Sequence, residues 1–269
     1  MESVTVRFEE LVALENLSFE MTTGETRVVL GAAGSGKTTL LKTALGLIKP
    51  DAGRVFLFGR DITGLGEREM FDIRSQVGVL FQEGGLFDSI TVAENVAYPL
   101  VNRRMQTVST AEVDERVVDA LRFVELEQTL EKYPSELSGG MRRRVGITRA
   151  IVSQPPLVLY DSPTAGLDPI TANTIMALIA KERDSQNTTA LIVTQRYQDG
   201  QLMANFRYNR NSGQLEPISR NGDARDPGSI PRPTTFMVMK EGRVVFEGTE
   251  AELEASTDRY ISKFVPKRS

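Results

Sequence analysis

The chain has 269 residues, of which 40% are hydrophobic and 25% charged, and its formal net charge is −4 at pH 7. These values are typical of a globular protein with its own core, and they exclude a disordered chain. The sequence has no cysteine and no histidine, which excludes disulfides, thiolate metal sites and a histidine general base. The small acidic excess disfavours a dedicated nucleic-acid binder, and no run reaches the roughly 18 apolar residues of a membrane-spanning helix.

Short apolar strands and longer helical segments alternate along most of the chain. Strands are predicted over 4–8, 14–21, 26–30, 54–58, 77–81, 157–160 and 189–193, and helices over 37–48, 138–152 and after Asp168. The stretch from 88 to 134 is helical in pattern, and Thr91 with Glu94 and Ser109 with Glu112 fit capping boxes. This alternation predicts an α/β fold with a mostly parallel sheet and helices on both of its faces.

Residues 198–235 interrupt the alternation, because they are rich in Asn, Gly, Arg and Pro and show no sustained period. We interpret them as a loop insertion, with a partner contact through its arginines as the alternative. A hairpin is predicted over 236–239 and 243–246, followed by a helix capped by Thr249 and Glu252. The run 142–144 is all arginine, and a solvated face or a contact within a dimer is favoured over a nucleic-acid patch.

The strongest chemical signal is the segment Gly31-Ala-Ala-Gly-Ser-Gly-Lys37-Thr38. It matches the phosphate-binding pattern G-x-x-x-x-G-K-[ST] and lies between a predicted strand and a predicted helix, as that pattern requires. Its glycines let backbone N–H groups surround phosphate oxygens, and the following helix directs its positive end at them. The Lys37 ammonium can reach the β- and γ-phosphates, and the Thr38 hydroxyl can ligate Mg²⁺. The segment therefore predicts a nucleotide site rather than a simple glycine turn.

A second motif, Leu137-Ser138-Gly139-Gly140-Met141, indicates what the nucleotide does. Two glycines after a serine cap expose helix N–H groups, which suits an anion that arrives from outside the chain. On its own, the motif is better explained as an ordinary serine-capped helix. It precedes Asp161, however, which closes the apolar run 157–160 and can hold Mg²⁺.

Together, these motifs resemble those of the ATP-binding cassette family over nearly the whole chain. The resemblance implies a P-loop NTPase fold in a single nucleotide-binding domain over 1–269, with an antiparallel β subdomain. It also implies a helical subdomain at about 88–140, which docks on transmembrane partners, the insertion at about 198–235, and a C-terminal hairpin and helix over 236–269. ATP and Mg²⁺ are the implied cofactors.

The family resemblance also assigns roles to individual residues. It implies that Phe8 packs against adenine, that Gln82 is the Q-loop glutamine, and that Thr38, Gln82 and Asp161 ligate Mg²⁺. The residues implied to bind ATP are Phe8, Gly31, Ala32, Ala33, Gly34, Ser35, Gly36, Lys37, Thr38, Thr39, Gln82, Ser138, Gly139, Gly140 and the D-loop residue Asp168. The implied catalytic residues are Lys37, Gln82, Asp161, Ser162 and Gln195.

Two of these positions depart from the family pattern. Ser162 follows Asp161 where the family has a glutamate that activates water, and loss of a general base lowers a rate by about 10²–10⁴-fold. Gln195 stands where the family has its switch histidine, and its amide can still donate to a γ-phosphate. The site is therefore expected to be slow or silent, unless another carboxylate, Glu83 or Asp168, replaces the missing base.

The resemblance implies that the signature of one subunit closes on the ATP held by another. The first hypothesis is the energising subunit of a membrane transporter, dimeric and cytoplasmic, held on the inner face of the cell membrane by an integral permease. Met141 and the tail Gly248-Thr-Glu-Ala-Glu-Leu are similar to cassettes of the lipid-asymmetry type, which work with mammalian-cell-entry proteins. The second hypothesis is a hydrolysis-poor regulatory subunit that pairs with a competent cassette, and the third is a soluble cassette for repair or translation.

Overall fold

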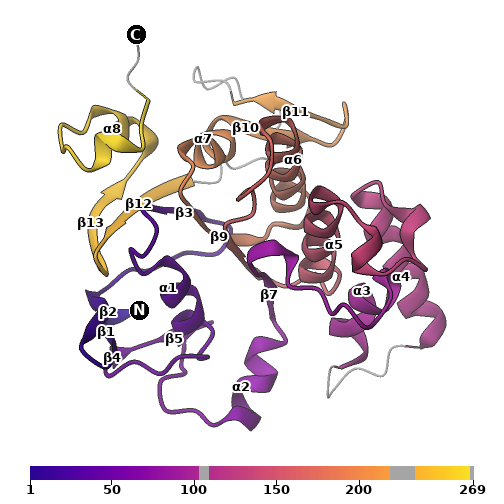
Figure 1. Cartoon of the computed structure of the whole chain (residues 1–269), viewed down its shortest axis with the longest axis horizontal. Helices are drawn as coiled ribbons and strands as arrows, with labels where there is room; N and C mark the ends of the chain where they lie inside the picture. The colour runs from indigo at the N-terminus through magenta and orange to yellow at the C-terminus, as the bar shows by residue number, and fades with distance from the viewer. Residues whose placement is uncertain (103–108, 219–233, 267–269) are drawn as a thin grey trace.

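A central sheet organises the computed structural model, which describes residues 1–102, 109–218 and 234–266 (Figure 1). The sheet has six strands in the order β13-β12-β3-β9-β8-β7. They are β3 (Thr26–Gly31), β7 (Val77–Leu80), β8 (Leu157–Asp161), β9 (Thr189–Thr194), β12 (Thr234–Lys240) and β13 (Arg243–Gly248). Neighbours from β12 to β7 run parallel, and β13 pairs antiparallel with β12. The predicted α/β fold with a mostly parallel sheet is confirmed.

Helices pack on both faces of this sheet. They are α1 (Lys37–Ala44), α2 (Glu67–Arg74), α3 (Val92–Val101), α4 (Thr110–Phe123), α5 (Gly139–Ile151), α6 (Pro169–Gln186), α7 (Tyr197–Asn205) and α8 (Glu250–Ala255). Short 3-10 turns are η1 (Gln82–Gly84), η2 (Glu127–Thr129), η3 (Pro134–Glu136) and η4 (Ile261–Lys263). Each expected helix start with a serine or threonine cap is present, at Thr91, Ser109, Ser138 and Thr249.

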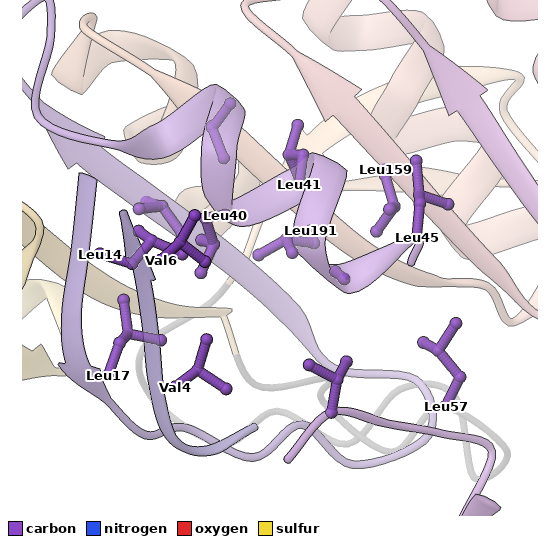
Figure 2. Packing of buried hydrophobic residues seen from close by; sticks show 14 of the residues in the cluster. Val4, Val6, Leu14, Leu17, Leu40, Leu41, Leu45, Leu57, Leu159 and Leu191 are labelled. Atoms are coloured by element: carbon purple, nitrogen blue, oxygen red, sulfur yellow. The ribbon is translucent and has the colours of Figure 1, made fainter. Parts of the chain in front are cut away.

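Alternate residues of the central strands enter two different cores, because successive side chains of a strand point to opposite faces. Leu159 and Leu191 pack with α1 and the N-terminal strands, whereas Val158 and Ile192 pack with α5 and α6. Figure 2 shows the first core, in which Leu40 and Leu41 of α1 lie among side chains of the sheet and of the N-terminal strands. Burial on both faces explains why these strands read as continuous apolar runs.

Three smaller antiparallel sheets lie around the central one. Strand β1 (Glu2–Phe8) pairs with β2 (Leu11–Leu17) and β4 (Ala52–Arg54), and β5 (Phe56–Leu57) pairs with β6 (Arg60–Asp61). The single strand predicted over 54–58 is thus two short strands with different partners. The strand predicted over 14–21 lies earlier, at Leu11–Leu17, because these are the residues that pair with β1.

The predicted loop insertion at 198–235 is wrong for its described part. Residues 197–205 form α7, and β10 (Phe206–Asn209) and β11 (Gln214–Pro217) form a hairpin. Tertiary packing orders this segment, since Tyr197 and Met203 are buried and the Cα of Gly200 lies close against the Phe236 ring. Residues 219–233 of the predicted insertion lie outside the described residues.

Candidate nucleotide-binding site

The predicted site residues lie at the carboxyl ends of four parallel strands. Leu30 pairs with Thr194, Asp161 with Val193, and Leu80 with Tyr160, so β3, β9, β8 and β7 end at the same edge. The phosphate-binding loop follows β3, Gln195 follows β9, and Gln82 lies two residues beyond β7. In open α/β sheets, ligands bind outside this edge.

The phosphate-binding loop needs glycine at the residue before α1. Gly36 has φ of 100°, and a Cβ there would lie 2.5 Å from the Ala13 carbonyl oxygen. Only glycine adopts this conformation and tolerates so close an approach of another backbone. The loop is thereby held against β2 and delivers Lys37 as the first residue of α1.

The Lys37 side chain is hydrogen-bonded to other residues of the phosphate-binding loop. Its Nζ donates to the carbonyl oxygens of Gly31 and Ala32, each at 2.8 Å, and to Ser35 Oγ at 3.3 Å. Burial lowers the pKa of the Lys37 ammonium, and the nearby Asp161 carboxylate opposes that shift. A buried ammonium that holds only neutral carbonyl and hydroxyl groups can exchange them for phosphate oxygens, which bind it more strongly.

Thr38 and Asp161 meet beside this lysine, although they are far apart in the sequence. Thr38 Oγ1 donates to Asp161 Oδ2 at 3.0 Å, and Ser162 Oγ donates to Asp161 Oδ1 at 3.1 Å. A hydroxyl and a single carboxylate are hard oxygen donors, and Mg²⁺ is commonly held by one or two carboxylates together with substrate phosphates. The donor set therefore fits Mg²⁺, which would be held by Thr38 and Asp161 and would neutralise phosphate charge.

Ser162 is held in an unusual backbone conformation. Its φ is 50°, in the left-handed region that non-glycine residues rarely adopt, and its N–H donates to the Val193 carbonyl oxygen at 2.9 Å. The side chain is partly buried and bonded to Asp161. No carboxylate stands at this position, so the structure offers no general base there.

Asp168, one of the two carboxylates considered as a substitute base, is the N-cap of α6. Its Oδ1 accepts the N–H groups of Ile170 and Thr171, each at 3.0 Å. The hydrogen bond from the Thr171 side chain, followed by these backbone bonds, holds the pKa of Asp168 below its ordinary value. That makes Asp168 a weaker base. The side chain of the other candidate, Glu83, lies outside the described part of the structure.

The remaining predicted residues occupy separate elements. Phe8 ends β1 with 46% of its surface exposed, Gln82 and Gln195 are exposed, and Ser138 caps α5 by accepting the Met141 N–H at 3.3 Å. Figure 1 shows α5 well apart from α1, with β7 and β9 between them. The structure therefore brings together the phosphate-binding loop, Asp161 and Ser162, whereas the signature segment lies elsewhere on the chain.

Two contacts to the loop carry no signal in the sequence. The Tyr260 hydroxyl accepts the Ala32 N–H at 3.2 Å and donates to the Met239 carbonyl oxygen at 3.0 Å. Gly242, at the turn of the C-terminal hairpin, donates its N–H to the Ser35 carbonyl oxygen at 3.1 Å. The C-terminal part of the chain thus stabilises the phosphate-binding loop through hydrogen bonds to its backbone. A lone tyrosine in a tail gives no sign of such a role.

The run of three arginines makes contacts within the chain. Arg142 donates to the carbonyl oxygen of Leu137, Arg143 to that of Ala165 and Arg144 to that of Val124. Arg143 is buried, which a solvated face does not predict. These arginines tie α5 to the segments around it. Within the residues that the structure describes, none of the helices combines the length and apolarity needed to cross a membrane.

A glycine loop between β3 and α1, with an acid at the end of the parallel strand β8, which is separated from β3 by β9 alone, defines a P-loop nucleotide-binding protein. A family model described as "ABC transporter" matches residues 14–165, more than half of the chain. The chain therefore belongs to the ABC transporter family.

Individual relatives agree with this assignment. The chain is 29% identical over all its 269 residues to the intermembrane phospholipid transport system ATP-binding protein MlaF of Haemophilus influenzae, covering 90% of that protein. It is 39% identical over 182 residues to the methionine import ATP-binding protein MetN of Carboxydothermus hydrogenoformans, and 36% over 194 residues to the probable ribonucleotide transport ATP-binding protein mkl of Mycobacterium leprae. These matches cover 68% and 72% of the chain, and span about half the length of the two relatives, 53% and 55%.

Solved structures give the same fold. The dimeric structure of MJ0796, a bacterial ABC transporter cassette, superposes with a TM-score of 0.76 at 28% identity, covering 92% of this chain and 97% of that one. A dimeric structure of the same cassette in a post-hydrolysis state, bound to ADP and Pi, superposes with a TM-score of 0.75. The ABC-type P-loop fold expected from the sequence is confirmed.

Proposed function

We propose that this chain is the ATP-binding subunit of a transporter for a lipid or another apolar substrate. The observation that carries the proposal is the assembled half-site, in which Lys37 lies in the loop and Thr38 and Asp161 are in contact beside it. The substrate class rests on the relative named for intermembrane phospholipid transport, which aligns with the whole chain. The methionine and ribonucleotide relatives align with about two thirds to three quarters of it.

The proposed site is completed by a second subunit. Ser138 and Gly139 are exposed at the N-terminus of α5, where free N–H groups and the helix dipole favour an anion. They lie away from the chain's own loop, and the solved structures of MJ0796 are dimers. ATP held by Lys37 and Thr38 of one subunit would then meet Ser138–Gly140 of the other.

A permease would bind beside the site, where aromatic side chains are exposed. Phe81, Phe87 and Tyr98 expose 39%, 43% and 45% of their surface, and the Phe87 and Tyr98 ring centroids are 4.8 Å apart. Arg149 fixes the segment between Phe81 and Phe87 by donating to the Gly84 and Gly85 carbonyl oxygens. A partner on this surface would directly adjoin Gln82. The subunit would then lie on the cytoplasmic face of the inner membrane, beneath a permease and a mammalian-cell-entry-type substrate-binding protein.

A second candidate function is favoured by Ser162. A serine hydroxyl is not a base at neutral pH. The Asp161 carboxylate beside it already accepts hydrogen bonds from Thr38 and Ser162, so neither group is placed to take a proton from water. The alternative is a hydrolysis-poor subunit that closes on ATP and lends its signature to a competent cassette. The first candidate predicts measurable turnover by this chain, and the second predicts binding without turnover.

The test of the proposed function is nucleotide binding by Lys37→Ala. Removing this ammonium should weaken Mg-ATP binding by at least about tenfold, because a charge-assisted contact to phosphate is lost. The matched control is Lys42→Ala, which removes an exposed lysine from the same helix and should leave the affinity unchanged. Equal affinity of wild type and Lys37→Ala in calorimetry would refute the nucleotide site and, with it, the proposed function.

A further inference from the structure

Asp199, in the first turn of α7, has a carboxylate that neither the motifs nor the site described above uses. Its residue is only 2% exposed. Thr164 Oγ1 and Thr194 Oγ1 both donate to its Oδ2, at 2.6 and 2.7 Å, and Arg196 Nε lies 3.5 Å from its Oδ1. Both carboxylate oxygens are therefore engaged by polar groups from two other loops.

These two loops follow strands β8 and β9 and begin beside the predicted site residues Asp161 and Gln195. Thr164 lies in the segment between Asp161 and the D-loop aspartate, and Thr194 immediately precedes Gln195. Thr194 Oγ1 also accepts the Arg196 N–H at 3.1 Å, which closes a tight turn around Gln195. The Asp199 carboxylate thus orients the Thr194 hydroxyl that closes the turn around Gln195.

We propose that Asp199 is a positioning residue that fixes the Gln195 loop relative to the Asp161 loop, so that the Gln195 amide faces the terminal phosphate of the bound nucleotide. This inference rests on the proposed function, because it takes Gln195 as the group that distinguishes ATP from ADP. Asp199 acts through Thr164 and Thr194 and does not itself touch the nucleotide.

The chemistry of the position supports a role beyond packing. Burial raises the pKa of Asp199, because the charged form loses its hydration, while the hydrogen bonds from Thr164 and Thr194 and the charge of Arg196 act in the opposite direction. An apolar side chain at this position would avoid that desolvation cost. A buried carboxylate that accepts two hydroxyl donors on one oxygen links two loops in a way that an apolar contact does not, since hydrogen bonds fix direction.

The Asp161 loop has a second, independent anchor on the signature helix. Arg143 of α5 donates from Nη2 to the Ala165 carbonyl oxygen at 3.1 Å, one residue after Thr164. The segment after Asp161 is thus tied to α5 on one side and, through Asp199, to the Gln195 loop on the other. A displaced Gln195 loop would no longer be held in register with Asp161.

The test measures the affinities of the full-length chain for Mg-ATP and Mg-ADP. Thr194→Val keeps the side-chain shape and removes the hydroxyl, and should weaken Mg-ATP binding by about fivefold or more while Mg-ADP binding stays within twofold. The loss is selective because only ATP carries the terminal phosphate that Gln195 faces. Thr194→Ser retains the hydroxyl and should restore the wild-type ratio of the Mg-ATP affinity to the Mg-ADP affinity. Thr164→Val, at the other end of the link, should lower the ratio in the same direction and provides the readout if Thr194→Val does not fold.

Two further variants separate positioning from loss of stability. In a Gln195→Ala background, Thr194→Val should cause no further loss of the ATP to ADP ratio, because the group being positioned is gone. The matched control is Thr188→Val, which removes a buried threonine–carboxylate hydrogen bond of 2.6 Å to Glu182, outside the site. It should lower the melting temperature and leave the ratio unchanged.

The inference is overturned if Thr194→Val weakens ATP and ADP equally, if its effect persists in the Gln195→Ala background, or if Thr188→Val changes the ratio as much. It is also overturned if both Thr194→Val and Thr164→Val leave the ratio at its wild-type value. Failure of the proposed function is distinct from these outcomes, since it would appear as Lys37→Ala binding both nucleotides like wild type.

Discussion

Ser162 lies next to the acid proposed to hold Mg²⁺, and its main chain is held in one conformation whatever its side chain does. The left-handed φ of 50° places any non-glycine side chain at the same angle, and the bond from its N–H to Val193 keeps it there. A left-handed conformation costs an L-residue about 1–2 kcal/mol, and Glu and Gln, like Ser, have no branch at Cβ that would add to this cost. Exchanging Ser162 for Glu or Gln therefore changes the chemistry of the site with little change in backbone strain.

Ser162→Glu should raise the ATP turnover rate by at least about tenfold, because it places a carboxylate beside the site where a general base contributes about 10²–10⁴-fold. Gln195→His alone should have a smaller effect, since the Gln195 amide is already a donor, and the double variant should exceed either single change. Steady-state phosphate release measures all three.

Ser162→Gln is the matched control for that series, because it adds the same bulk at φ of 50° without a base. It should leave turnover at the wild-type level. A wild-type rate of several turnovers per second with a neutral Ser162→Glu would contradict the assignment of a missing base and would place the catalytic carboxylate elsewhere.

At the scale of single elements, α5 has two ends with different roles. Its N-terminus is exposed at Ser138 and Gly139, while its later turns are buried, with Val145 and Ile147 in two different cores. A Cβ on Gly140 would lie 2.8 Å from Thr171 Cγ2 at the start of α6. The helix is therefore anchored by its body and by its contact with α6, and it presents its first turn to a partner.

Ser138→Arg should abolish ATP-dependent dimerisation and leave ATP binding by the monomer intact, because a bulky cation would stand where the helix terminus must meet the other subunit's nucleotide. Sedimentation velocity with and without Mg-ATP measures the dimer. Thr110→Arg, at the exposed first residue of α4, is the control and should dimerise normally. Loss of monomer ATP binding in Ser138→Arg would contradict the proposal that Ser138 meets the nucleotide of the other subunit.

At the scale of the whole molecule, the aromatic surface of Phe81, Phe87 and Tyr98 adjoins Gln82 at the edge where the parallel strands end. The helical block of α3 and α4 lies on one side of the molecule, and the N-terminal sheet lies on the opposite side (Figure 1). A partner that moves α3 would therefore act on the segment that follows Gln82, because Arg149 contacts both Asn95 of α3 and the Gly84–Gly85 turn.

Tyr98→Asp should release the chain from the membrane fraction of the cells that produce it, because a carboxylate cannot be desolvated in an apolar interface without a partner. ATP binding should be unchanged. Leu47→Asp is the control, since Leu47 is similarly exposed, at 49%, near the end of α1. Retention of Tyr98→Asp on the membrane to the same extent as wild type would contradict docking through this surface.

Local interactions made the main elements predictable. The helix starts at Thr91, Ser138 and Thr249 depend on a side chain and an N–H three residues later, so their signal lies within one turn. The glycines of the phosphate-binding loop are similar, because Gly34 and Gly36 require positive φ. The alternation of strands and helices sufficed for the α/β class. It failed over 197–217, where short elements are ordered by packing on Phe236 and not by a periodic apolar face.

Distant contacts were decided only by the tertiary structure. Thr38 and Asp161 are 123 residues apart, Ala32 and Tyr260 are 228 apart, and Thr164 and Asp199 are 35 apart. Whether such groups meet depends on the order and register of the strands and on how the C-terminal segment packs, and none of these is encoded in the residues next to them. The sequence by itself determined which chemical groups the chain possesses and the local backbone that carries them. Their mutual distances, and hence the inferred link between the Asp161 and Gln195 loops, came from the sheet that brings four strand ends to one edge.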